Sequence, residues 1–114
     1  MTVTTNHADL SELGRFADPS LLILTSLAGG PKHGHAIIQD IAAMSGVRLG
    51  PGTLYGALGR LEQRGLITPL PAEERRRPYR LTGLGATALR EQLTSLASVA
   101  ATGLARLATS LDTA

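Results

Sequence analysis

The chain has 114 residues, no cysteine and no tryptophan, and 43% of its residues are hydrophobic while 18% are charged. This hydrophobic fraction excludes a wholly disordered chain, and the lack of cysteine excludes a disulfide scaffold. The longest apolar stretch, residues 21–28, is far shorter than the roughly 20 residues that cross a bilayer. The N-terminus shows no secretory signal. We therefore expect a single small domain that is cytoplasmic and has no membrane partner.

Positive charge is concentrated in the middle of the chain. Residues 48–80 contain seven basic and three acidic residues, a net charge of +4, whereas the remainder sums to −2. Ten of the eleven basic residues are arginine, whose planar guanidinium suits phosphate, although a compositional bias of the genome would also favour arginine over lysine. The middle third is therefore the basic face.

The first two thirds of the chain predict three helices. Residues 1–17 show no firm period and form an arm or a short helix. Asp18 and Pro19 are a typical N-cap and first-turn pair, and they start a helix that runs to about residue 27. A second helix begins near residue 34 and ends at Gly46, and a three-residue extended piece follows. A third helix opens at residues 50–53 and continues to Arg64.

The last third predicts a hairpin and a long helix. Residues 66–69 and 78–81 form two short strands, joined by a long basic loop. Thr82 caps a final helix whose apolar residues alternate at spacings of three and four. The fold is thus mostly α with a small β-hairpin wing, a winged helix-turn-helix plus a C-terminal dimerisation helix. We expect an N-terminal arm over 1–17, the winged helix-turn-helix over 18–82 and the dimerisation helix over 83–114.

The outward face of the third helix is unusually bare. If Leu54 marks the buried stripe, Gly52, Gly56 and Gly59 fall on the opposite side. Each mid-helix glycine costs about 1 kcal/mol relative to alanine. Our hypothesis is that their missing side chains let the helix backbone approach a DNA groove closely, whereas the alternative is sequence noise at an exposed site.

Polar residues flank this bare face. Thr53 and Arg60 lie on one edge, where we expect them to contact the groove and its walls. Tyr55 lies on the other edge, where its hydroxyl reaches a phosphate if it is not simply a tyrosine at the margin of the core. Thr53 can also cap the helix, and both roles are compatible.

Arg75, Arg76 and Arg77 form the basic tip of the predicted hairpin. The bland alternative is a solvated loop that the preceding two glutamates neutralise. Because the tip lies beside a candidate recognition helix, we instead expect contacts with the DNA backbone or minor groove. Lys32 and His33, just before the second helix, add phosphate contacts at its N-terminus.

The sequence offers little for a metal site or for catalysis. His33 and His35 are two residues apart and do not share a helix face, and cysteine is absent. No nucleophile elbow, phosphate-cradling glycine loop or paired-carboxylate signature is present. We therefore expect no enzyme, no metal and no cofactor.

The final helix has an apolar seam over about three heptads. One chain cannot bury this seam alone, and folding back onto the first helix is the monomeric alternative to pairing with a second copy. We favour the homodimer, with an interface formed by Leu89, Leu93, Leu96, Ala100, Leu104, Leu107 and Leu111.

Three segments resemble the PadR family of transcriptional regulators. They are residues 21–34, which end in Lys-His-Gly, residues 50–67, and residues 76–82. The resemblance covers roughly residues 18–95, and by length the chain is similar to the short subfamily with one C-terminal helix. It implies a homodimeric winged-helix repressor that binds a double-stranded DNA operator, with recognition from Pro51 to Arg64 and a wing from Arg75 to Tyr79.

The resemblance also implies a ligand, because relatives respond to phenolic acids or hydrophobic drugs. The chain departs from the family pattern at His35, where tyrosine is common, which introduces a group that titrates near neutrality. The chain has three aromatic residues, Phe16, Tyr55 and Tyr79, which are too few to build a stacked aromatic cage around a drug. An effector pocket lined by aliphatic side chains is the alternative. The alternative from another class is a winged-helix module that binds an acidic protein partner and never reads DNA.

Overall fold

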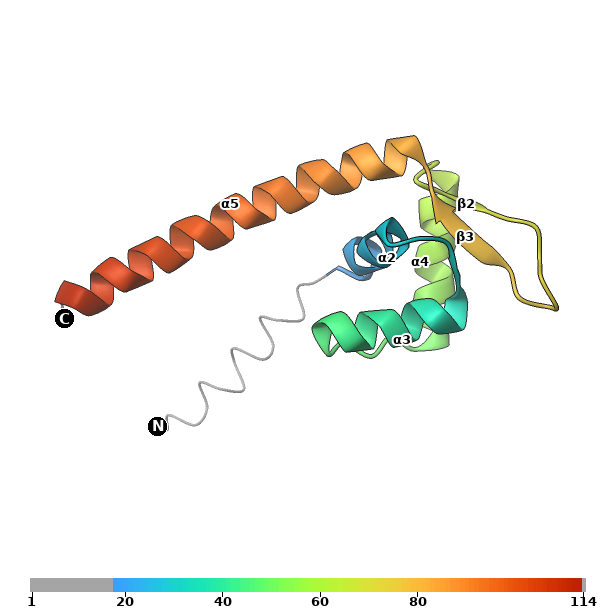
Figure 1. Ribbon diagram of the computed structural model, residues 1–114, viewed down its shortest axis with the longest axis horizontal. Helices are drawn as coiled ribbons and strands as arrows, with labels where there is room; N and C mark the ends of the chain where they lie inside the picture. Colours follow the sequence, from blue (N-terminus) through green and yellow to red (C-terminus); the bar gives the residue numbers. More distant parts are fainter. Residues whose placement is uncertain (1–17, 114) are drawn as a thin grey trace.

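The structure is a computed structural model that describes residues 18–113. The arm expected over residues 1–17 lies outside the described residues. Four helices and three short strands follow in chain order (Figure 1). They are α2 (Pro19–Ala28), β1 (Lys32–His33), α3 (Gly34–Ser45), α4 (Pro51–Gln63), β2 (Ile67–Pro69), β3 (Pro78–Leu81) and α5 (Gly83–Thr113). The predicted winged helix-turn-helix with its long last helix is confirmed, while residues 47–49 adopt no regular secondary structure.

The helix ends follow from local sequence signals. The Asp18 carboxylate accepts a hydrogen bond from the backbone N–H of Ser20 at 2.9 Å, which satisfies one of the free amides in the first turn of α2. Gly46 ends α3 in the left-handed region, at φ 78°. The Thr82 hydroxyl accepts from the backbone N–H of Gly85 at 3.0 Å, so the predicted cap of α5 is present.

The wing is larger than the predicted hairpin, because β1 adds a third strand. The sheet is antiparallel in the order β1-β3-β2, with His33 opposite Pro78 and Ile67 opposite Leu81. A strand of two residues has no period for sequence reasoning to detect. The consequence is that the start of α3 is hydrogen-bonded to the wing.

The hydrophobic core lies where α2, α3 and α4 meet the sheet and the start of α5. Its fully buried members come from four elements, and α5 contributes one leucine. The largest are Ile23, Ile37, Ile41, Leu54, Leu58 and Ile67. Leu89 is only 5% exposed within this core. Its prediction as a dimer contact is therefore corrected: Leu89 anchors α5 to the chain's own core.

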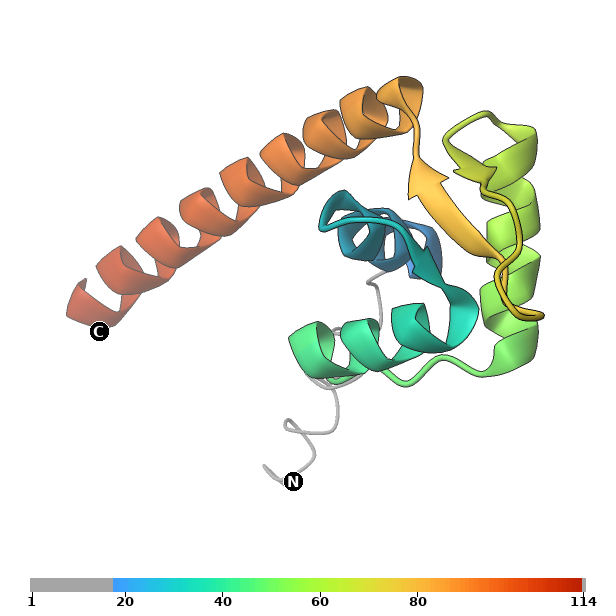
Figure 2. The ribbon, with the colours of Figure 1, turned by 45° about the vertical axis from the view of Figure 1, so that its right-hand side comes forward.

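Beyond its first turns, α5 projects away from the rest of the protein (Figures 1 and 2). Its 31 residues extend about 46 Å at 1.5 Å per residue. Leu93, Leu96, Leu104 and Leu107 are 40–69% exposed along this helix. No helix within residues 18–113 is long and apolar enough to span a membrane.

Candidate nucleic-acid interface

The two faces of α4 differ as its sequence predicts. Leu54, Leu58 and Leu61 are buried, while the opposite face carries residues that are all exposed. These are Pro51, Gly52, Thr53, Gly56, Gly59 and Arg60. A Cβ added at Gly52 or Gly59 would meet nothing within 4 Å. The buried stripe thus fixes α4 to the core, and the opposite face carries few projecting side chains.

Tyr55 lies outside the core, at the edge of this face. Its side chain is 54% exposed, so about half of its surface is available for contact with a ligand. The ring lies directly over Gly34, the first residue of α3. A Cβ at Gly34 would overlap the Tyr55 hydroxyl and come within 2.9 Å of Cζ. Glycine at this position therefore leaves room for the Tyr55 hydroxyl against the start of α3.

A tight turn forms the tip of the wing. The backbone N–H of Glu73 donates to the carbonyl of Arg76 at 2.6 Å, and the N–H of Arg76 donates to the carbonyl of Glu73 at 2.8 Å. The two residues between them, Glu74 and Arg75, have φ of 51° and 80°. Two successive positive φ values are typical of a type I′ turn, which normally selects Asn and Gly. The tip therefore holds Arg75 in a conformation that few arginines adopt.

A hollow of about 280 Å³ brings these parts together. Side chains from the start of α3, from α4 and from both sides of the wing line it. They are His33, Gly34, His35, Tyr55, Arg75, Arg76, Arg77 and Tyr79. Six of the predicted DNA-binding residues are among them, and the sequence places them up to 46 positions apart.

The wing arginines are not neutralised by their neighbours. In the part of the chain that the structure describes, no ion pair within 4.0 Å joins Arg75, Arg76 or Arg77 to a carboxylate. Without direct ion pairs, Glu73 and Glu74 offset two of the three arginine charges only at longer range, and residues 73–77 keep a net charge of +1. Unpaired guanidinium groups around a concave surface favour an anion.

Tyr79 faces the same hollow from β3 and stays protonated. Burial raises the pKa of the Tyr79 hydroxyl, and the charge of Glu62 and the nearby Tyr55 raise it further, while Arg77 lowers it. A neutral phenol keeps its O–H and can donate a hydrogen bond to an anion. Tyr79 therefore does not oppose the positive charge of the wing.

His33 connects α3 to the wing. Its Nδ1 lies 3.4 Å from the backbone nitrogen of Ala36 and caps α3, and its Nε2 lies 3.3 Å from a guanidinium nitrogen of Arg76. The pairing of β1 with β3 explains the second contact, because it places His33 opposite Pro78, two residues beyond Arg76. Sequence reasoning placed His33 at a helix N-terminus without its partner on the wing.

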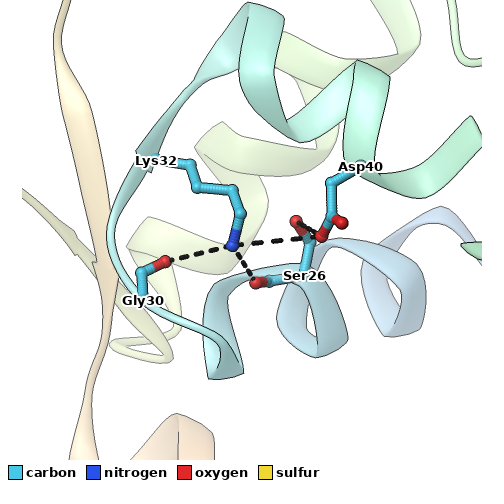
Figure 3. A network of polar contacts seen from close by, with 4 residues as sticks. All are labelled: Ser26, Gly30, Lys32 and Asp40. Atoms are coloured by element: carbon cyan, nitrogen blue, oxygen red, sulfur yellow. Dashed lines mark hydrogen bonds and ion pairs between the residues drawn. The ribbon is translucent and has the colours of Figure 1, made fainter. Parts of the chain in front are cut away.

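Lys32 has a structural role that differs from its predicted phosphate contact (Figure 3). Its ammonium donates to the Ser26 carbonyl at 2.5 Å and lies 3.9 Å from the Asp40 carboxylate. That carboxylate also accepts from the buried Ser26 hydroxyl at 2.6 Å. Lys32 thus joins the end of α2 to α3, and its ammonium is engaged inside the protein. We remove it from the interface for this reason.

A second and larger hollow lies away from the wing, between α2, α4 and α5. Its volume is about 710 Å³. Arg60, at the edge of the bare α4 face, also borders this hollow, and its guanidinium lies 3.6 Å from where a Cβ on Gly56 would be. The apolar lining comes mainly from leucines. These are Leu21, Leu24, Leu61, Leu66, Leu89 and Leu96. The sequence showed the individual helices but not the space that they enclose.

No metal centre is evident within residues 18–113, where no three His, Asp or Glu side chains cluster to hold an ion. His33 and His35 both border the first hollow. The described residues that line this hollow include no Asp or Glu that could serve as a third ligand. The nitrogens of His33 also already face Ala36 and Arg76.

Comparison with known proteins places the chain in a family. The sequence model for the transcriptional regulator PadR-like family matches residues 23–91, more than half of the chain. An uncharacterized 37.1 kDa transposon protein of Streptomyces fradiae is 48% identical over 83 residues, which are 73% of this chain and 24% of that protein. The chain therefore spans about a quarter of that relative's length.

Further relatives agree in sequence and structure. A transcriptional regulator of Mycobacterium tuberculosis is 38% identical over 86 residues, 70% of this chain and 77% of that protein. A PadR family regulator of Eggerthella lenta superposes with a TM-score of 0.70 at 28% identity, covering 91% of this chain and 92% of that one. A regulator of Clostridium thermocellum gives 0.68 at 27% identity, covering 81% and 91%. The chain belongs to the transcriptional regulator PadR-like family.

Proposed function

We propose that this protein is a sequence-specific repressor that binds a double-stranded DNA operator as a homodimer. One observation carries the proposal: Tyr55 on α4, the start of α3 and three unpaired wing arginines converge on one hollow. In this arrangement α4 enters the major groove, which is about 12 Å wide, while the wing follows the adjacent backbone. The proposal includes no catalytic step.

The bare face of α4 allows a close approach to the groove floor. Gly56 and Gly59 are exposed and weaken the helix by about 1 kcal/mol each relative to alanine. Stability therefore does not explain why glycine occupies these positions, whereas close contact with DNA does. Pro51, Gly52 and Thr53 bring the first turn, with its free N–H groups, towards phosphate. Replacing Gly56 by leucine should raise the melting temperature and weaken DNA binding. Unchanged affinity in a more stable variant would refute this role.

Phosphate contacts come from the wing and from His33. Replacing Arg77 by glutamine should weaken binding about equally for all sequences and lower the slope of log K against log salt by about one. A loss confined to one operator base pair would show that Arg77 reads sequence. Because the ammonium of Lys32 is held by Ser26 and Asp40, we expect its replacement to act through stability.

The homodimer rests on the projecting part of α5. Leu93, Leu96, Leu104 and Leu107 are exposed in the single chain, and burying such a stripe favours association. Ala100 is exposed between them, and the side chain of Leu111 lies outside the described residues. Two copies would present two α4 helices to half-sites about one helical turn apart. Sedimentation that shows only monomer at micromolar concentration would remove this part.

The larger hollow supports release by a small hydrophobic effector. Half of its lining residues are leucines and the rest include Arg60 and Arg64; its volume is about 710 Å³ and it lies between α2, α4 and α5. A ligand there could change the angle of α5 and so the spacing of the two α4 helices. Among the described residues, no aromatic side chain lines this hollow, so the leucines would supply the apolar contacts to the effector that we propose.

Selection of bound duplexes from a random pool is the decisive experiment. A two-fold symmetric motif would establish DNA recognition, the operator and dimeric binding together. Absence of any duplex binding at low salt would refute the proposal and favour a module that binds an acidic protein.

A further inference from the structure

The His33 imidazole is offered two hydrogen-bond donors but can accept only one of them. The backbone N–H of Ala36 points at Nδ1 from 3.4 Å, and the Arg76 guanidinium lies 3.3 Å from Nε2. A neutral imidazole has one acceptor nitrogen, and the other carries the proton. The two contacts therefore cannot both be hydrogen bonds in one tautomer.

The helix cap has the stronger claim on this single acceptor. Ala36 is the third residue of α3, so its N–H has no carbonyl partner within the helix, and the residue is half-buried. Arg76 is exposed, so water can satisfy its guanidinium. With Nδ1 accepting the cap, the proton lies on Nε2. The contact between His33 and Arg76 is then one of two donors facing each other.

Two donors at 3.3 Å can share one acceptor that lies within hydrogen-bond distance of both. We infer that His33 Nε2–H and the Arg76 guanidinium together hold one phosphodiester oxygen of DNA. This inference rests on the proposed function and assigns a specific anion site within it. The surrounding groups agree, because Arg75, Arg77 and the hydroxyl-bearing Tyr55 line the same hollow. The structure gives the Tyr55 hydroxyl no hydrogen-bond partner among the described residues.

The site also ties the wing to the helix-turn-helix. His33 reaches it from the first cap of α3, and Arg76 reaches it from the residue that closes the wing turn. One phosphate bound by both groups relieves the opposition between the donors and fixes the wing against α3. The wing is then held in its DNA-contacting position by the DNA itself.

A double-mutant cycle on duplex affinity tests this arrangement. The variants are His33→Asn, which keeps a good N-cap acceptor and lacks the far ring nitrogen, and Arg76→Gln. The probe is a fluorescein-labelled duplex of random sequence at low salt, with Arg106→Gln on α5 as a charge-loss control. We expect each single variant to bind about tenfold more weakly, because each removes a hydrogen bond to a charged group.

The double variant distinguishes one shared phosphate from two separate ones. We expect it to lose little more than the singles, and the salt slope to fall by about one, because a single phosphate contact is lost. A loss near a hundredfold with a slope lower by two would overturn the shared site. If the unmodified protein binds no duplex, the proposed function fails together with the site.

The tautomer is a second test that does not depend on DNA. Long-range proton–nitrogen NMR spectra of the free protein should show His33 protonated at Nε2 and unprotonated at Nδ1. A proton on Nδ1, with Nε2 accepting from Arg76, would overturn the inference even where DNA binding is intact. His33→Asn should keep the melting temperature within a few degrees, since the α3 cap is preserved.

Discussion

Replacing Gly85 by alanine tests how closely α5 is joined to the wing. Gly85 is buried in the first turn of α5. An added Cβ would overlap the carbonyl oxygen of Leu66 and lie 2.9 Å from both the carbonyl carbon and Leu81 Cδ1. The oxygen belongs to the backbone, so it cannot swing away like a side chain. That carbonyl also accepts the Thr82 N–H at 3.1 Å, and moving it would break this bond.

The expected destabilisation follows from these contacts. Overpacking costs about 1–3 kcal/mol, and the lost hydrogen bond adds about 1 kcal/mol. The helix preference of alanine returns about 1 kcal/mol. We therefore expect a net loss of about 1–3 kcal/mol, a drop in melting temperature of about 4–13 °C for a chain of this size.

Gly59→Ala is the matched control, because the same atoms are added on an exposed helix face where nothing lies within 4 Å. It should gain about 1 kcal/mol. Circular dichroism melts at matched protein concentrations measure both variants. If Gly85→Ala were as stable as the unmodified protein, α5 would not be held against β2 as the structure describes.

Three further predictions concern α5, the wing tip and pH. Leu104→Arg should convert the dimer to a monomer in sedimentation, whereas Thr102→Arg on the opposite side of α5 should not; equal behaviour of the two would place the interface elsewhere. Arg75→Gly should relieve about 1 kcal/mol of left-handed strain and slow amide exchange of the two N–H groups that close the turn, and unchanged exchange would contradict the strain. Because burial raises the pKa of Tyr79, folding favours its neutral form, so this contribution is complete below the unfolded pKa near 10 and is lost as pH rises through the folded value. Urea unfolding of Tyr79→Phe should therefore lose less stability between pH 9 and pH 11 than the unmodified protein, and an equal loss would show that Tyr79 is not responsible.

The helices were predictable because their signals are local. The cap at Asp18, the left-handed Gly46 and the cap at Thr82 each act within four residues of the helix end that they define. The strand β1 was not predictable, because its two residues are extended only through pairing with β3. Such a strand is a consequence of tertiary structure, and no periodicity within the sequence predicts it.

In the candidate site, too, features set by local sequence were predictable and features set by tertiary contacts were not. Residue type and helical spacing identified the bare face of α4, since exposure on a helix follows from its buried stripe. They did not separate Lys32 from His33, two adjacent basic residues before α3. The difference depends on Asp40 in the second turn of α3, whose carboxylate attracts the Lys32 ammonium, while the sheet register places His33 near Arg76.

The contrast between these neighbours shows what an exposed charge needs in order to bind DNA. Lys32 has a longer side chain and a permanent charge, yet its ammonium already has a carbonyl and a carboxylate, so a phosphate would have to displace both. The Nε2 of His33 faces another donor, so we expect an incoming oxygen to displace no internal hydrogen bond there. We therefore expect the availability of the donor, rather than formal charge, to decide which of these two adjacent residues contacts DNA.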